Sequence, residues 1–172
     1  ARTDPPIASS NAGAQVNFTA PPIVFSTVPG AKLSAVGPSF SAYLSSAQTF
    51  TTAVTTKVAF NSEHFDNGSC FDSTTNRRFQ PTVAGNYQVS WLVTFKSTGA
   101  LSVNTYTPTL YKNGAIYANS NYANCAATVA ALGGSALVYM NGTTDYLEVF
   151  AVASGTGTLT FGGGTGETTF SA

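Results

Sequence analysis

The chain has 172 residues, with seven Lys or Arg against seven Asp or Glu and no net formal charge at pH 7. Nucleic acids and anionic membranes bind basic patches. The longest basic run here is the pair Arg77-Arg78, so we expect neither partner. No apolar run approaches the roughly 20 residues that span a bilayer. The 16 Gly, 12 Phe and 8 Tyr, with abundant Thr, are typical of an all-β protein.

Residues 1–37 are expected to form an extended, Pro-rich N-terminal arm. Pro-Pro pairs disfavour helix and remove donors from a sheet ladder. A merely disordered tail seldom carries apolar clusters, yet this segment contains Val16, Phe18, Ile23, Val24 and Phe25. Two readings remain open: an arm that docks onto a partner, or a linker that lies along its own domain. The first residues lack the basic-then-apolar pattern of a secretory signal. Either a signal was removed before this sequence begins, or the protein is made and used without export; we expect the second, with synthesis in the host cytoplasm and a place on the capsid surface of a virion.

Residues 38–172 are expected to form a β-rich head domain. Asn113-Gly114 and Asn141-Gly142 are typical of tight hairpin turns. The Ala-rich segment Tyr122–Leu132 could form a helix ending at Gly133-Gly134, but we expect the sheet context to override it. The predicted strands are Ser39–Leu44, Thr56–Asn61, Arg78–Pro81, Asn86–Lys96, Leu101–Tyr111, Ala115–Asn119, Ala136–Met140, Asp145–Ala153, Gly157–Gly162 and Thr168–Ala172.

The segment Asn86–Lys96 has a strict period of two residues. It predicts a half-buried strand with one face on the core and one face in water. The core-facing side chains are Tyr87, Val89, Trp91, Val93 and Phe95.

The segment Asp145–Ala153 is apolar on both faces, so its outer face needs a cover. Either another subunit or the chain's own loops supply that cover. The first reading predicts a subunit interface formed by Tyr146, Phe150, Val152 and, from the last predicted strand, Phe170.

Several short motifs, in this order, make the head similar to the globular domain of complement C1q. Phe79-Gln-Pro81 followed by Ala84-Gly-Asn-Tyr87 resembles the Phe-x-x-Pro-x-x-Gly-x-Tyr signature of that family. Leu110-Tyr-Lys-Asn-Gly114 resembles its Asn-Gly hairpin, and Thr169-Phe-Ser-Ala172 resembles its closing strand. The resemblance implies an antiparallel ten-stranded jelly-roll β-sandwich, shared with the tumour necrosis factors, and a homotrimer around a threefold axis. It implies no single activity.

Catalytic chemistry is scarce in the sequence. His64 is the only histidine, which excludes multi-histidine zinc sites. Glu63, Asp66 and Asp72 could bind calcium, although loop carboxylates are more often solvated, and Glu63 with Asp66 could form a glycosidase pair. We predict a protein that is not an enzyme, with no catalytic residue, metal or cofactor.

The two cysteines, Cys70 and Cys125, are too few for a disulfide scaffold. They could form one bridge or remain two buried thiols, and the sequence leaves both open. Neither has an activating base beside it in the sequence.

Two functions of different classes follow. The first is a trimeric cement or decoration protein of a bacteriophage virion, whose arm attaches to the major capsid protein or another virion protein and whose head projects as a knob. The second is the receptor- or glycan-binding tip of a tail fibre or adhesin, with ligand loops containing Asp66, Asp72, Asn119 and Tyr122. A secreted C1q-like signalling or lectin domain is a third reading.

Overall fold

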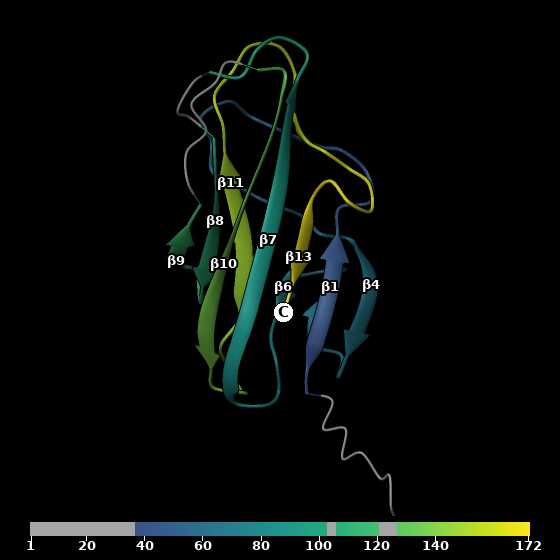
Figure 1. Cartoon of the computed structure of the whole chain (residues 1–172), viewed down its shortest axis with the longest axis vertical. Coiled ribbons are helices and arrows are strands. Elements are labelled where there is room, and N and C mark those ends of the chain that lie inside the picture. The colour runs from purple at the N-terminus through teal and green to yellow at the C-terminus, as the bar shows by residue number, and fades with distance from the viewer. Residues whose placement is uncertain (1–36, 103–105, 121–126) are drawn as a thin grey trace, which may run out of the picture. The chain divides into compact units, whose positions relative to one another are not determined.

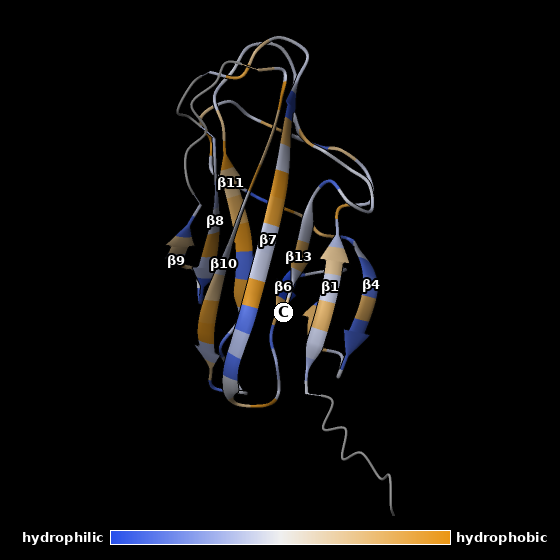
Figure 2. Ribbon diagram, viewed as in Figure 1, coloured by the Kyte–Doolittle hydropathy of each residue, from blue (hydrophilic) through white to orange (hydrophobic). Residues whose placement is uncertain are grey.

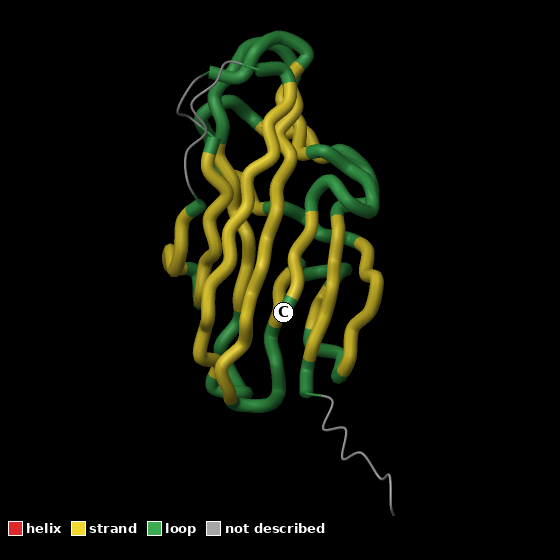
Figure 3. The backbone as a smooth tube through the Cα atoms, viewed as in Figure 1, coloured by secondary structure: helices red, strands yellow, loops and turns green. Residues whose placement is uncertain are grey.

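The computed structural model describes residues 37–102, 106–120 and 127–172. Within them the chain forms strands, turns and loops and no helix (Figure 3). No helix long and apolar enough to span a membrane occurs in these residues. The arm residues Val16, Phe18, Ile23, Val24 and Phe25 lie outside the described part, as do Tyr122 and Cys125.

The first sheet contains the long strand β7 at its centre (Figure 1). Its strand order is β2-β12-β7-β13-β1-β4, and β10 pairs with the other edge of β7. The bounds are β1 (Ser39–Tyr43), β2 (Gln48–Phe50), β4 (Ser62–Asn67), β7 (Gly85–Ser97), β10 (Val129–Met140), β12 (Leu159–Phe161) and β13 (Thr169–Ser171).

The second sheet has the order β5-β6-β11-β8-β9, with β3 also paired to β11. The bounds are β3 (Thr56–Lys57), β5 (Phe71–Asp72), β6 (Arg78–Phe79), β8 (Thr107–Lys112), β9 (Ala115–Asn119) and β11 (Leu147–Val152). The described residues form thirteen strands, seven in the first sheet and six in the second. The predicted antiparallel jelly-roll sandwich is therefore confirmed, with a strand count close to the ten expected.

The core lies between the sheets and is dominated by Phe. The Phe40 ring, from β1, stacks on Phe71 and on Phe79 of the second sheet, with 4.7 Å between centroids in each case. The Phe170 ring meets Phe40 edge-on at 4.9 Å. Phe170 is fully buried within the single chain, so its predicted place in a subunit interface is wrong: a side chain that points into the sandwich offers no surface to a neighbour.

The strand β7 has the predicted alternation up to Val93, whereas Thr94, on the face expected in water, is buried. Its side chains from Val89 to Phe95 at every second position are buried, and Tyr87 is half-buried. Figure 2 shows apolar and polar segments following one another along this strand. The Trp91 indole N–H has a hydrogen-bond partner inside the core, because Nε1 donates to the Ser120 hydroxyl at 3.0 Å.

The strand β10 is longer than predicted, because it includes Val129–Leu132 of the helical candidate and both following glycines. A Cβ on Gly134 would lie 2.5 Å from the Trp91 ring. The glycine therefore allows the strand to cross Trp91 closely rather than ending a helix. The sheet context overrides the helix propensity of Val129–Leu132, as expected; the start of the candidate lies outside the described residues.

The Asn113-Gly114 turn joins β8 to β9 with positive φ angles at both residues, 53° and 79°. Asn tolerates this region and Gly enters it without strain, so the predicted hairpin is confirmed. The predicted strand Thr56–Asn61 is mostly loop and retains only Thr56–Lys57.

Three strands had no counterpart among the predicted ones: β2, β4 and β5. The strand β4 is an edge strand with the sequence Ser-Glu-His-Phe-Asp-Asn and a mostly exposed surface. An edge strand needs no regular apolar face, so periodicity gave no signal for it.

Candidate functional site

The first ligand-loop residue, Asp66, stabilises the turn that follows β4. Its Oδ1 accepts the Cys70 main-chain N–H at 3.0 Å, and its Oδ2 accepts the Phe71 N–H at 3.1 Å. The Cys70 thiol also lies 3.0 Å from Oδ1 as a donor. These contacts occupy both carboxylate oxygens and give Asp66 a structural role.

The second, Asp72, organises the loop between β5 and β6. Its Oδ1 accepts the main-chain N–H groups of Thr74 and Thr75 at 2.9 and 2.8 Å, and its Oδ2 accepts that of Asn76 at 2.9 Å. These hydrogen bonds, from Thr75 first and then Asn76 and Thr74, hold the pKa of Asp72 well below its ordinary value. The carboxylate is thus ionised and largely used by its own loop.

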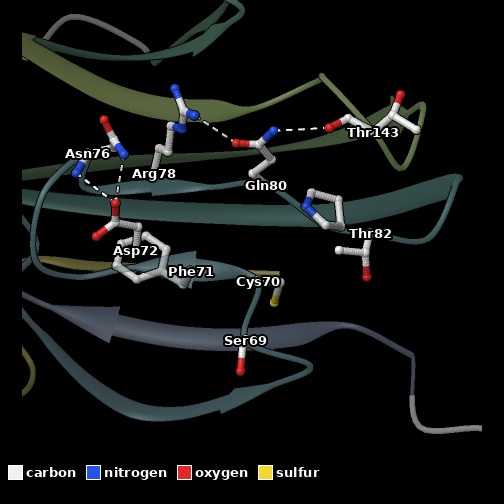
Figure 4. Close-up of a pocket in the computed structure, with 10 residues that line it drawn as sticks. Ser69, Cys70, Phe71, Asp72, Asn76, Arg78, Gln80, Thr82 and Thr143 are labelled. Atoms are coloured by element: carbon white, nitrogen blue, oxygen red, sulfur yellow. Dashed lines mark hydrogen bonds between the residues drawn. The ribbon is translucent and has the colours of Figure 1, made fainter.

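A cavity of about 230 Å³ opens beside this loop, and Figure 4 shows its lining. Arg78 donates from Nη2 to Gln80 Oε1 at 2.8 Å, and Gln80 donates to the Thr143 carbonyl at 3.1 Å. The Arg78 guanidinium also lies 4.4 Å from the centre of the Tyr146 ring. Arg78 and Gln80 of this cavity are therefore engaged with neighbouring polar groups. Tyr146, predicted at a subunit interface, already packs under a cation of its own chain.

The Cys70 thiol at the same cavity is a free, buried cysteine. Burial raises the pKa of this thiol to about 12, and the hydrogen bond with Asp66 and the negative charge of that carboxylate add to the effect. A thiol with so high a pKa is a poor nucleophile at neutral pH.

The remaining candidate chemistry is not assembled into a site. The His64 ring packs 4.6 Å from that of Tyr43, and its Nε2 lies 3.2 Å from the Thr165 carbonyl oxygen. In the described residues, no three His, Cys, Asp or Glu side chains come close enough together to hold a metal ion. The geometry thus brings together neither a calcium cluster nor a catalytic acid–base group around His64.

A second hollow, with a volume of about 370 Å³, lies over β8, β9 and β11. We call it the β8–β11 groove; it is lined by Thr55, Thr107, Thr109, Tyr111, Ile116, Asn119, Phe150, Ala151 and Val152. It contains three residues named from the sequence: Phe150 and Val152, predicted at an interface, and Asn119, predicted in a ligand loop. Their neighbours Thr107 and Thr109 carried no sequence signal.

The outward face of β10 is an exposed apolar strand surface that sequence reasoning missed. Val129, Leu137 and Tyr139 expose 54%, 62% and 57% of their surface. The other outward residues of the strand are small and uncharged: Ala131, Gly133 and Ser135. The signal that could have identified it is a run of twelve residues, 129–140, without a charge.

This sheet order defines the class: a jelly roll of the type found in tumour necrosis factors. Among solved structures, the chain is similar to murine APRIL (TM-score 0.52, 9% identity, covering 78% of this chain and 95% of that one). It is also similar to Eiger TNF from S. frugiperda (0.50, 10%, 78% and 90%) and to the globular domain of zebrafish complement 1qA (0.47, 16%, 78% and 94%). No protein-family model and no curated protein matches the chain. At such low identities, the likeness to murine APRIL and Eiger TNF establishes the fold alone.

Proposed function

We propose that this chain is a non-enzymatic structural protein that assembles as a homotrimer. The observation that carries the proposal is the uncharged outward face of β10, where Leu137 and Tyr139 expose more than half of their surface. Soluble proteins rarely leave such a strand face in water. The C1q-like motifs of the sequence independently favour three copies around one axis.

We place the subunit contact on β10 rather than on the outer face of β11. Phe150 is half-buried, because its ring packs 4.5 Å from that of Tyr111. The outward side chains of β10 have no such cover within the described part of the chain. There the strand also pairs with β7 alone, and its other edge has only two side-chain contacts, from Tyr117 to the Leu137 carbonyl and from Lys112 to the Tyr139 carbonyl. A second copy that covers this face would bury apolar surface and protect the edge at once.

A non-enzymatic role agrees with the state of the reactive groups. The Cys70 thiol is buried with a raised pKa, and the carboxylates of Asp66 and Asp72 are engaged with main-chain N–H groups. The contact between the Cys70 thiol and Asp66 Oδ1 raises the pKa of the thiol and so does not activate it as a nucleophile.

The wider role we propose is that of a virion cement or decoration protein, with residues 1–37 attaching the head to a phage capsid. The support is the Pro-rich, apolar segment before a head of low charge and high Thr and Gly content. Such a segment is suited to lie along another protein's surface.

Three measurements test these proposals separately. Native mass spectrometry at micromolar concentration is expected to give three times the chain mass of 17.7 kDa, and a monomer would contradict the trimer. Capsids depleted of the protein are expected to bind the full chain but not residues 38–172, whereas equal binding would contradict the attachment role. Hundreds of copies per particle are expected for a cement, against a few trimers for a fibre tip.

A further inference from the structure

The β8–β11 groove combines two half-buried aromatic rings with Thr and Asn side chains, and none of its lining side chains is charged. The rings are those of Tyr111 and Phe150, whose centroids are 4.5 Å apart at an interplanar angle of 44°. Its volume of about 370 Å³ falls in the range of roughly 300–1,000 Å³ that small-molecule sites occupy. A ligand that fits this lining is neutral and has both an apolar face and hydroxyl groups.

One hydroxyl of the groove has no hydrogen-bond partner. Thr107 is only 5% exposed, and its Oγ1 is the buried side-chain polar atom left unsatisfied in the described residues. An orphaned buried hydroxyl costs about 1–3 kcal/mol, and native structures rarely contain one without a reason. Thr107 lines the groove, but its Oγ1 is itself buried, so a polar group entering there satisfies the hydroxyl once the Thr107 side chain turns to another staggered rotamer.

Two more polar groups face the same hollow in register across the sheet. Thr109 lies between Asn119 of β9 and Phe150 of β11. The Thr109 hydroxyl donates to Asn119 Oδ1 at 2.9 Å, which fixes the amide and leaves its Nδ2 donors for a ligand. The Asn119 amide, the Thr109 hydroxyl and the Phe150 ring therefore lie side by side across three neighbouring strands.

We infer that the groove binds a neutral pyranose ring, as a free sugar or as a unit of an uncharged glycan. A pyranose has an apolar C–H face that packs on an aromatic ring and hydroxyls that both donate and accept. Phe150 and Tyr111 contact the C–H face, Asn119 Nδ2 donates to a ring hydroxyl, and Thr107 receives the partner that it lacks. The inference goes beyond the proposed assembly and does not depend on it, because the groove and the outward face of β10 belong to different sheets.

The test is saturation-transfer NMR on the full chain with the methyl glycosides of glucose, galactose, mannose and N-acetylglucosamine. At least one sugar is expected to bind at millimolar concentration. Phe150→Ala and Asn119→Ala are each expected to weaken binding about three- to tenfold, the loss of one stacking contact or one hydrogen bond. The matched controls are Phe65→Ala on β4 and Asn86→Ala on β7, both exposed outside the groove, which are expected to bind as the unchanged chain does.

The variant Thr107→Val separates a binding role from a structural one. It removes an unsatisfied hydroxyl at nearly constant shape, so the melting temperature is expected to stay the same or rise while sugar affinity falls. Affinity electrophoresis through gels containing dextran or mannan distinguishes the two ligand sources: retardation favours a glycan chain, and binding of monosaccharides alone favours a free sugar. The inference is overturned if no sugar or polymer binds, or if Phe150→Ala and Asn119→Ala bind as tightly as the controls. The native mass is measured in a separate experiment, so the sugar-binding result can be interpreted even if the chain is not a trimer.

Discussion

The Tyr117 hydroxyl donates a hydrogen bond to the main-chain carbonyl of Leu137 at 3.1 Å. Tyr117 lies on β9 and Leu137 on β10, so this bond connects the last strand of one sheet to the last strand of the other. Figure 1 shows the two strands on the same side of the sandwich. The bond closes that side of the sandwich without covering the apolar side chains of β10.

Replacing Leu137 with Asp is expected to convert the trimer into monomers. The side chain is 62% exposed, so the free energy of unfolding of the head is expected to change by no more than about 0.5 kcal/mol, while a charge buried in an interface is strongly unfavourable. Native mass spectrometry measures the outcome. Val83→Asp, at a residue 52% exposed in a loop before β7, serves as the control and is expected to leave the trimer intact. A Leu137→Asp trimer would exclude this face as the contact.

Gly134→Val is expected to destabilise the head by about 1–3 kcal/mol, the usual cost of forcing extra atoms into a packed region. The added Cβ would lie 2.5 Å from the Trp91 ring, and the strand or the ring must move. Urea unfolding followed by Trp fluorescence reports both the stability and the ring's environment. The neighbouring Ser135→Ala points outward and is expected to have little effect; equal losses in the two variants would contradict the close approach.

Asp72→Asn is expected to reduce stability at neutral pH by about 1 kcal/mol, since an amide keeps one acceptor and turns a donor toward the N–H groups of the loop. The pKa of Asp72 is lowered in the folded state. The stabilisation by the carboxylate is therefore complete above the ordinary value of 3.8 and is lost as the pH falls below it. Thermal unfolding of both chains across the acid range checks the prediction: their difference should shrink as the pH falls, and a constant difference would contradict it.

Cys70 is expected to resist thiol reagents in the folded state. With its pKa raised to about 12 from 9.0, labelling at mildly alkaline pH should be slower than in the unfolded chain by about a hundredfold or more. The measurement is made in a Cys125→Ser background so that Cys70 is the one thiol that can be labelled. A group with a raised pKa stabilises the fold below the ordinary value, and that contribution is lost as the pH rises from about 9 toward 12. Rapid labelling of the folded chain would contradict the burial of this thiol.

The sequence predicts most of the sandwich because its long strands carry regular patterns. The alternation from Tyr87 to Phe95 and the apolar inner face of β11 both have the predicted orientation. The Asn113-Gly114 hairpin also follows from local chemistry alone, because both residues accept positive φ.

The candidate sites were far less predictable. The alternation around Phe170 does not tell which face of its strand is buried. Only the position of β13 between β1 and β7 shows that Phe170 lies on the inner face. Asp66 and Asp72 look like loop ligands in sequence, yet their oxygens are used by N–H groups two to five residues away. The β8–β11 groove depends on cross-strand register, which joins Asn119 to Phe150 through Thr109 and is not encoded in any local motif.

The position of β13 has a consequence for biosynthesis. This strand comes last along the sequence, yet it lies inside the first sheet, where Phe170 pairs with Ala42 on one side and Trp91 on the other. While a ribosome makes the chain, β1 and β7 emerge early but lack the strand that joins them. Productive folding of the head must therefore wait until residues 169–171 have left the exit tunnel, and until then two unpaired strand edges are open to nascent chains on the same message.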